Sequence, residues 1–519
     1  MKSMDGGRIM IYFKQNNELT IPEKPVPLVA ENSFINKEQD RAELPVFEEI
    51  KDKLPLPVWE GHEDYINCYW KTWSLAFGNL RKPNEGTTFV SNFIDTAFND
   101  SLFMWDSAFI LMFGKYAQRI FNFQGTLDNM YSHQHRDGYI CREINTINDK
   151  DRFTRYDVAS TGPNIMAWCE WDYYLNFGDK ERLAKVFPPL MAYHRWMAEH
   201  RTWQDGTYFS SGWGCGMDNI PRLMPGYSTF YSHGHMVWVD ACMQALNNCN
   251  ILINMAKILE RNEFINDLEY ERDNLCKVIN EKLWDEETGF YYDLWKNGEL
   301  NGVMHIGAFW ALLSECAPKD RAERLIAHLS DEKSFKTPNR VPALARSDKN
   351  YEDAGKYWRG GVWAPTNYMV LKGLDKYKNF ELAHEIAMDY LRAVVDVFKK
   401  TDTLFENYAP EYIDGEFSEG NPAKSDFVGW TGLAPVSILF EYVFGIKPDA
   451  ANNKIVWDVN LLEEHGIKNY PFGTDGTLTL ICKKRTDENE KPQIIFESDI
   501  PLTLEVRWGK ENQKQSMIY

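Results

Sequence analysis

The stretch that decides the fold is residues 234–283, GHMVWVDACMQALNNCNILINMAKILERNEFINDLEYERDNLCKVINEKL. Its apolar side chains recur three and four positions apart, at Leu246, Ile251, Ile253, Ala256, Ile258 and Leu259, then at Phe264, Leu268, Leu275, Val278, Ile279 and Leu283. This spacing is the 3.6-residue period of an amphipathic helix. The stretch therefore predicts two consecutive helices, over 234–260 and 263–283.

The same period continues through most of the chain. It predicts ten further helical segments, near 62–80, 105–117, 119–133, 158–176, 179–201, 303–315, 319–330, 362–376, 379–400 and 427–446. Twelve helices without alternating strands exclude a parallel α/β sheet, and we find no 34- or 40-residue period typical of a helical repeat. The count is typical of an all-α (α/α)6 barrel, a closed ring of paired helices, over residues 61–446.

The two ends of the chain differ from this helical region. Residues 1–60 have little helical periodicity and carry six prolines, Pro22, Pro25, Pro27, Pro45, Pro55 and Pro57. Because proline fixes φ and removes a donor, they predict an extended N-terminal segment that packs on the barrel. In residues 447–519, short β-rich runs at 477–481, 493–496 and 502–506 are separated by Gly, Asp and Pro. They predict a small antiparallel β module.

Composition excludes several classes of protein. With 44% hydrophobic and 14% aromatic among 519 residues, the chain is too apolar for intrinsic disorder. Apolar runs such as 434–442 are too short to cross a bilayer, so no membrane partner is expected. A net charge of −19 would repel a nucleic-acid backbone. The 18 tryptophans indicate either a core of large side chains or rings that stack on sugars.

The cysteines and the N-terminus indicate a cytoplasmic protein. Nine cysteines are scattered without a C-x-x-C pair, which excludes a disulfide framework and a zinc ribbon. Residues 1–18 lack the apolar region of a signal peptide. The alternative is an exported protein whose signal segment lies outside this sequence.

Six clusters between the predicted helices carry the candidate chemistry. They are residues 104–107 (MWDS), 133–139 (HQHRDGY), 211–222 (SGWGCGMDNIPR), 357–363 (YWRGGVW), 405–408 (FENY) and 429–433 (GWTGL). A polyhydroxylated ring is bound by this combination, because carboxylates and Arg bind vicinal hydroxyls and indoles cover the apolar face. For any single cluster the alternative is structural, with Trp filling a loop and Asp capping a helix. Six together favour a sugar site.

The clusters resemble the motifs of a clan of inverting α-glycosidases, over roughly residues 60–446. The clan includes trehalase, the family 63 processing α-glucosidase I, and the bacterial mannosylglycerate and glucosylglycerate hydrolases. The resemblance is carried by Trp105-Asp106-Ser107 (W-D-S), Gly216 to Arg222 (G-M-D-N-S-P-R), Tyr357 to Trp363 (Y-W-R-G-x-x-W), Glu406-Asn407-Tyr408 (E-N-Y) and Trp430 to Leu433 (W-T-G-L). It implies that Asp218 is the general acid and Glu406 the general base.

Two departures from the clan's pattern bear on the substrate. Ile220 stands where the acid motif usually has Ser, which alters the wall near the acid. The sequence also lacks the large N-terminal β-domain of many family 63 enzymes, and so it looks like the compact bacterial members rather than a eukaryotic oligosaccharide-processing enzyme.

Elementary chemistry supports the same two carboxyl groups. Inverting hydrolysis needs a protonated carboxyl and an ionised carboxylate about 6.5–9.5 Å apart. Asp218 follows a Gly-rich turn beside Trp213 and Met217, where desolvation would raise its pKa. The neighbours Asn407 and Tyr408 can hydrogen-bond Glu406 and keep it charged. Glu411 is the alternative base.

Eight residues are predicted to contact the sugar: Trp105, Asp106, His133, Gln134, Trp213, Arg359, Trp363 and Trp430. N-terminal capping is the alternative for Asp106, and a loop-capping role is the alternative for His133 and Gln134.

No metal or cofactor is expected. His133 and His135 do not share a helix face and have no Cys or carboxylate at metal spacing. Gly360 and Gly361 do not follow a strand, so they do not form a phosphate-binding loop.

Three functions remain open from the sequence. The first is hydrolysis of an α-linked glucoside or mannoside with inversion, on a small carbohydrate such as a disaccharide, an oligosaccharide or a glycosylglycerate. The second is another (α/α)6 enzyme, either an epimerase with paired histidines or a lyase with a Tyr/His/Arg set. The third is a non-catalytic sugar-binding protein. Asp218 together with Glu406 favours the first.

Overall fold

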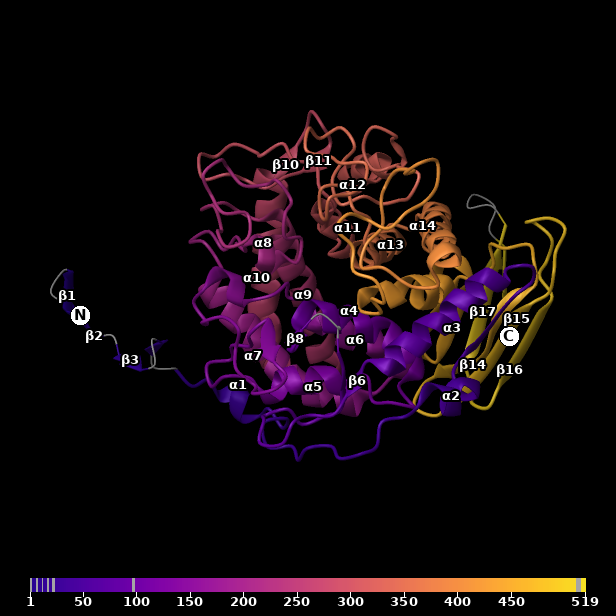
Figure 1. Cartoon of the computed structure of the whole chain (residues 1–519), viewed down its shortest axis with the longest axis horizontal. Helices are drawn as coiled ribbons and strands as arrows, with labels where there is room; N and C mark the ends of the chain where they lie inside the picture. The colour runs from indigo at the N-terminus through magenta and orange to yellow at the C-terminus, as the bar shows by residue number, and fades with distance from the viewer. Residues whose placement is uncertain are drawn as a thin grey trace.

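The computed structural model describes residues 2–5, 8–11, 13–15, 18–20, 24–95, 99–509 and 515–519. Pro22 lies outside these residues. The described chain is mostly helical, and its larger sheets are built mainly from the C-terminal part (Figure 1). Each of the twelve predicted helical segments contains a helix.

Six helices form the inside of the helical region. They are α4 (Met104–Gly114), α6 (Met166–Phe177), α9 (Val239–Ile258), α11 (Trp310–Leu313), α13 (Ala364–Lys376) and the π-helix η8 (Ala434–Val443). Each contacts the next along the chain, and η8 contacts α4, so their order closes on itself. Every residue of α4 and η8 is buried, as expected for helices that are apolar on all sides.

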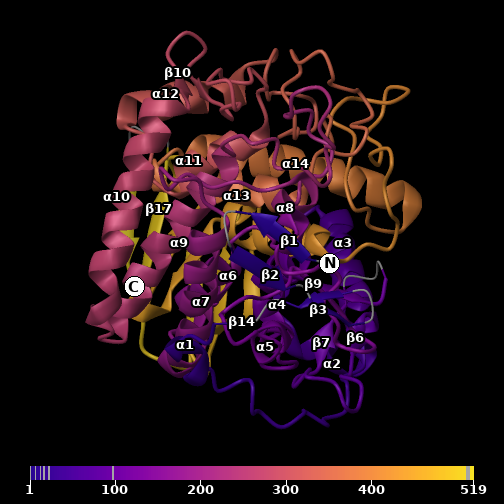
Figure 2. The same ribbon diagram turned by 90° about the vertical axis from the view of Figure 1, so that its left-hand side faces the viewer.

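Six helices that alternate with these along the chain lie outside them. They are α3 (Glu63–Gly78), α5 (Gly125–Ser132), α7 (Lys180–His200), α10 (Ile265–Lys282), α12 (Lys319–Ala327) and α14 (Phe380–Thr401). In α10 only a stripe of Leu268, Leu275, Val278 and Ile279 is buried, and the helix runs beside α9 (Figure 2). The helical periodicity of the sequence records this one-sided burial.

The C-terminal part forms two four-stranded sheets. Its strands are β12 (Ile446–Asp449), β13 (Lys454–Asp458), β14 (His465–Phe472), β15 (Gly476–Cys482), β16 (Ile494–Ser498), β17 (Thr503–Trp508) and β18 (Gln515–Ile518). The strand orders are β12-β13-β17-β18 and β16-β15-β14-β5, where β5 (Leu56–Trp59) comes from the N-terminal part. The expectation of a purely antiparallel module is wrong for β13 and β17, which pair in parallel.

The N-terminal part contributes to that module. β5 (Leu56–Trp59) pairs antiparallel with β14, with Trp59 opposite His465. Upstream, α1 (Pro27–Ala30) and α2 (Phe47–Ile50) are short helices in an otherwise extended path. Asn32 donates to the Tyr131 carbonyl at 2.9 Å, and Lys37 pairs with Asp128 at 2.8 Å. This segment therefore contacts α5 through Asn32 and Lys37.

Further upstream, four short strands pair as two hairpins. β1 (Lys2–Asp5) pairs with β2 (Arg8–Ile11), and β3 (Phe13–Gln15) pairs with β4 (Glu18–Thr20). Two other expectations can be checked against the described chain. All nine cysteines are free thiols, and no described helix combines the length and the apolar character needed to cross a bilayer.

Candidate active site

A cavity of about 370 Å³ lies where the inner helices begin. It is lined by Asn99, Phe103, Trp105, Asp106, Arg142, Glu143, Gly162, Pro163, Trp213, Gly216, Asp218, Tyr357, Trp358 and Trp430. Trp105 and Asp106 belong to the first turn of α4, Pro163 precedes α6, and Trp430 precedes η8. Three separate helix starts thus supply side chains to one pocket.

Five of the residues predicted from the sequence line this cavity: Trp105, Asp106, Trp213, Asp218 and Trp430. Glu406 adjoins it through Tyr357, whose hydroxyl lies 3.4 Å from Glu406 Oε1. Trp363 supports the wall from behind, because its ring stacks on Trp358 at 4.0 Å between centroids. Arg359 is not among the described lining residues, and its Nε is buried without a partner in the described chain.

The sugar contacts predicted for His133 and Gln134 are not supported by their positions. The Gln134 amide nitrogen donates to the carbonyls of Gly138 and Pro189 at 3.0 and 2.9 Å, so it joins backbone segments. His133 contacts Thr88 Oγ1 at 2.9 Å through Nδ1. The loop-capping alternative fits both residues better, because their polar atoms are already engaged away from the cavity.

The two histidines of this loop do meet a carboxylate, contrary to the sequence expectation. Asp151 lies 2.9 Å from His133 Nε2 and 2.8 Å from His135 Nε2. It comes from a segment 16 residues beyond His135, so local spacing did not reveal it. Arg155 donates to His135 Nδ1 at 2.6 Å, so Nε2 carries the proton and has no lone pair for a metal. The cluster therefore links the loop of His133 and His135 to Asp151 and Arg155 by hydrogen bonds.

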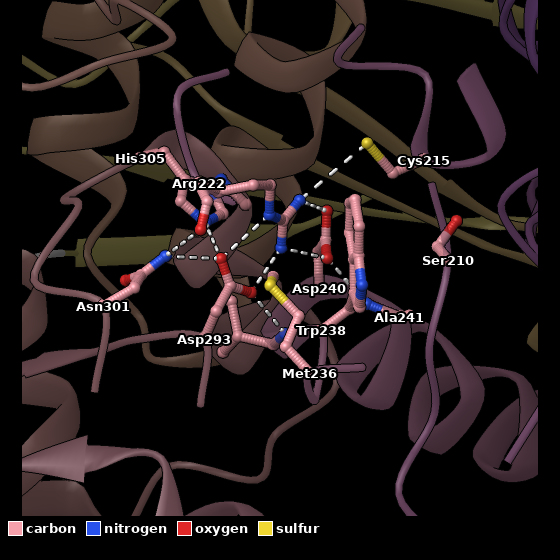
Figure 3. Close-up of polar contacts among 12 residues, drawn as sticks. Ser210, Cys215, Arg222, Met236, Trp238, Asp240, Ala241, Asp293, Asn301 and His305 are labelled. Atoms are coloured by element: carbon pink, nitrogen blue, oxygen red, sulfur yellow. Dashed lines mark hydrogen bonds and ion pairs between the residues drawn. The ribbon is translucent and has the colours of Figure 1, made fainter. Parts of the chain in front are cut away.

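Arg222 anchors the loop that carries Asp218 through buried ion pairs. This buried guanidinium donates to both carboxylate oxygens of Asp240 and of Asp293, at 2.5–2.8 Å, and lies 4.1 Å over the Trp238 ring (Figure 3). His305 Nε2 lies 3.3 Å from Asp293. Bidentate charged pairs of this kind hold a fixed geometry. The motif contained Arg222, but its anchoring role depends on partners 18 and 71 residues away.

The Asp218 loop is also held in place where Gly216 packs against the Trp105 ring. Gly216 has φ +73°, and a Cβ there would lie 3.0 Å from the Trp105 ring. Only glycine fits both the left-handed backbone and the adjacent indole. Trp105 and the acid loop are therefore packed directly against each other.

Asp218 has the raised pKa that a general acid needs near neutral pH. Burial raises its pKa to about 6, against an opposing effect from the Arg142 charge. A carboxyl group with such a pKa retains a substantial protonated fraction near neutral pH. Asp218 can therefore donate a proton there.

Glu406 lies on a separate loop and is only 5% exposed. Its backbone carbonyl accepts from Trp430 Nε1 at 2.8 Å. Burial raises its pKa to about 7, the Tyr357 hydrogen bond lowers it, and the Asp218 charge raises it.

The expectation that Asn407 and Tyr408 hydrogen-bond Glu406 is wrong. Asn407 donates to the Pro422 carbonyl, and the Tyr408 hydroxyl accepts from the Phe405 amide. Consecutive side chains of an extended segment point in opposite directions, so sequence neighbours do not share a partner. The alternative base Glu411 is engaged elsewhere, by Arg346 at 2.6 Å and Tyr351 at 2.9 Å.

Tyr357 is the central residue that sequence reasoning missed. Its hydroxyl lies 3.4 Å from Glu406 Oε1, and its side chain lines the cavity together with Asp106 and Asp218. Burial, and then the charges of Asp218, Glu406 and Asp106, raise its pKa. It occupies the left-handed region with φ +70°. Such strain in a non-glycine residue is typical of functional sites. Its place at the head of the Y-W-R-G motif was the available signal.

Asp106 is buried in the first turn of α4, and the helix begins after Phe103, so capping does not account for it. Burial and the Glu406 charge raise its pKa well above the ordinary value. Its Oδ1 has no partner among the described residues. The Asp106 carboxyl is therefore available to hydrogen-bond a ligand in the cavity.

Trp105→Ala is expected to raise KM about five- to tenfold and to lower kcat less. The indole lines the cavity, and stacking on the sugar is shared by ground and transition states. Steady-state kinetics on the accepted glycoside measures both constants. Trp171→Ala, which removes an indole outside this cavity, is the matched control. An unchanged KM in Trp105→Ala would assign Trp105 a purely structural role.

The comparisons with known proteins all find glycoside hydrolases. A family model described as the mannosylglycerate hydrolase MGH1-like glycoside hydrolase domain matches residues 100–431, almost two thirds of the chain. A probable mannosyl-oligosaccharide glucosidase of Schizosaccharomyces pombe is 22% identical over 64% of this chain and 41% of its own. A periplasmic trehalase of Escherichia coli O1:K1 is 26% identical over 45% of this chain and 39% of its own. The chain thus spans less than half the length of these two relatives.

A solved structure shares the fold. The family 63 mannosylglycerate hydrolase of Thermus thermophilus, determined with glucose, is 22% identical and superposes with a TM-score of 0.56. The likeness covers 71% of this chain and 99% of that one.

Proposed function

This chain belongs to the mannosylglycerate hydrolase MGH1-like glycoside hydrolase family, and on that premise we propose that it is an inverting α-glycosidase with Asp218 as general acid and Glu406 as general base. The observation that carries the proposal is the position of Tyr357. Its hydroxyl lies 3.4 Å from Glu406 Oε1, and its side chain lines the cavity together with Asp106 and Asp218. These three carboxyl groups come from three different loops or helix starts. We also infer that the closed order of inner helices is an (α/α)6 barrel.

The reaction uses the two carboxyl groups on opposite sides of the sugar. Protonated Asp218 gives its proton to the glycosidic oxygen as the bond to the anomeric carbon breaks. Ionised Glu406 takes a proton from a water molecule, and that water's oxygen bonds to the anomeric carbon from the other side. Trp105, Asp106 and Trp430 hold the glycone. The product sugar has the inverted configuration.

The start of the inner helices is a favourable place for an ionised base. Helix N-termini carry a partial positive charge, which stabilises nearby anions. Trp430, which donates to the Glu406 carbonyl, is the first residue of the 3-10 helix η7 (Trp430–Leu433), which leads into η8. The substrate class that fits the family and the cavity is an α-linked glucoside or mannoside.

The epimerase alternative loses its support. Paired histidines would have to face the sugar, whereas no histidine is among the described residues that line the cavity. A binding protein would not need a second carboxyl group on a separate loop.

Activity is expected to follow a bell-shaped pH profile with limbs near 6 and 7. Glu406 must be ionised, so kcat/KM falls when the pH drops and protonates it. Asp218 must be protonated, so kcat/KM falls when the pH rises and ionises it. Burial raises the pKa of both carboxyl groups, to about 6 for Asp218 and about 7 for Glu406, so the two limbs lie close together and the optimum is narrow. A profile flat from pH 5 to 9 would contradict the assignment.

A panel of α-linked glucosides and mannosides tests the proposed activity. Released sugar is measured for each, with the β-linked counterparts as controls. Hydrolysis of an α-linked member alone supports the proposal. Cleavage of β-linked substrates, or of none, would overturn it.

A further inference from the structure

A short aromatic segment is joined to the acid loop by its backbone. The Gly212 amide donates to the Thr229 carbonyl at 3.1 Å, and the Trp213 amide donates to the Phe230 carbonyl at 3.1 Å. A Cβ on Gly212 would lie 2.2 Å from the Thr229 oxygen and 2.5 Å from the Asp218 oxygen. Residues 229–231 and the Asp218 loop are therefore in direct contact.

The rings on this segment gather around Trp213. The Tyr231 ring lies 4.6 Å from the Trp213 ring, and the Phe230 ring lies 5.9 Å from it. Phe230 is 39% exposed and Tyr231 is 52% exposed. Large rings left exposed beside a pocket forgo the free energy of burial, which a ligand that covers them would recover.

The position of these rings relative to the acid defines their side of the substrate. In the proposed function the acid touches the leaving oxygen, so the leaving group lies on the side of the Asp218 loop. Trp213 lies on that loop and lines the cavity. Trp105 and Asp106, which hold the glycone, come from α4 instead.

The charges that line the cavity favour a neutral leaving group over an anionic one. Asp106, Glu143 and Asp218 line the cavity, and Arg142 is the single cation among the described lining residues. Its guanidinium already donates to the Ala159 carbonyl at 2.7 Å, lies 3.5 Å from Glu143 and covers the Phe153 ring at 4.6 Å. A carboxylate in the leaving group would have to share this one cation with Glu143 beside two further carboxyl groups, whereas a neutral sugar ring would find aromatic faces.

We propose that Trp213, Phe230 and Tyr231 form an aglycone subsite for a second, neutral sugar ring, which makes an α-linked oligosaccharide the substrate in preference to a glycoside of a small acid. The inference rests on the proposed function, because Asp218 as proton donor defines the aglycone side. Tyr231 and Phe230 then act on binding and orientation of the leaving sugar and have no part in the proton transfers.

Three kinds of substrate with the accepted glycone separate binding at the subsite from the chemical step. The α-glycosyl fluoride has no aglycone ring, the glycosylglycerate has an anionic aglycone, and the α-linked di- and trisaccharides have neutral rings. We expect kcat/KM for the oligosaccharides to exceed that for the glycosylglycerate at least tenfold. We expect Tyr231→Ala to lower kcat/KM about five- to tenfold on the oligosaccharides and to leave the fluoride unchanged.

The control is Tyr270→Ala, which removes a 79% exposed ring from α10, far along the chain from the cavity-lining residues. It should match the wild type on all three substrates. A double variant, Phe230→Ala with Tyr231→Ala, should deepen the loss on the trisaccharide.

The outcomes distinguish this inference from the proposed function. A wild-type enzyme that hydrolyses the fluoride but prefers the glycosylglycerate keeps the proposed function and overturns the neutral subsite. An equal loss of fluoride and oligosaccharide hydrolysis in Tyr231→Ala would also overturn it. Failure of the wild type on every substrate, the fluoride included, would overturn the proposed function and the subsite with it.

Discussion

Replacing Glu406 with glutamine is expected to lower kcat by about 10²–10⁴-fold and to leave KM close to the wild-type value. The amide has nearly the shape of the carboxylate but cannot take a proton from water. In the proposed site the sugar contacts come from other residues that line the cavity, so ground-state binding should persist. Steady-state kinetics over the pH range 5–8 measures the effect and should also show loss of the limb that arises from protonation of Glu406.

Glu411→Gln is the matched control for that variant. Glu411 is also poorly exposed, at 8%, but Arg346 and Tyr351 already occupy its carboxylate. Turnover within a few-fold of wild type is expected. Near-normal kcat in Glu406→Gln combined with a large loss in Glu411→Gln would transfer the role of base to Glu411.

Asp218→Asn is expected to lower kcat about 10²–10⁴-fold on glycosides whose leaving group needs a proton. The loss should be much smaller on the α-glycosyl fluoride, because fluoride departs without protonation by a general acid. This dependence on the leaving group separates an acid from a residue that merely supports the loop. Kinetics on both substrates, with melting temperature as a check on folding, measures it.

Asp353→Asn serves as the control for Asp218→Asn, because Asp353 is an exposed carboxylate of the loop that carries Tyr357. It should leave both activities unchanged. An Asp218→Asn variant equally impaired on both substrates would show that Asp218 does not act as the proton donor.

Outer helices such as α10 and α14 were predictable from sequence because each buries one stripe, which in α14 includes Ile386, Tyr390, Val394 and Val397. The inner helices α4 and η8 were recognisable by their length and apolar character rather than by a stripe. The pairing of β5 with β14 was not predictable, since it joins residues 56–59 to residues 465–468. A strand of four residues contains no local signal of its partner.

The site divides in the same way. Asp218 and Trp105, which line the cavity, could be singled out because their motifs are contiguous and contain uncommon residues. Tyr357 and Arg142 could not be given a role, because their neighbours in the cavity come from distant loops. His133 and Gln134 were assigned to the sugar on residue type alone, and their hydrogen bonds to Thr88 and to backbone carbonyls show the cost of that argument. The contacts of a residue in the structure, and not its residue type, decide whether it belongs to the cavity.

Proton NMR in the first minutes of hydrolysis is the most direct test of inversion by Asp218 and Glu406. An inverting pair acts through water and never forms a bond between Glu406 and the anomeric carbon. The β-anomer should therefore appear first from an α-linked substrate, before mutarotation mixes the signals. Initial appearance of the α-anomer, or a covalent intermediate trapped with a fluorosugar, would contradict the mechanism and the role of Glu406 in it.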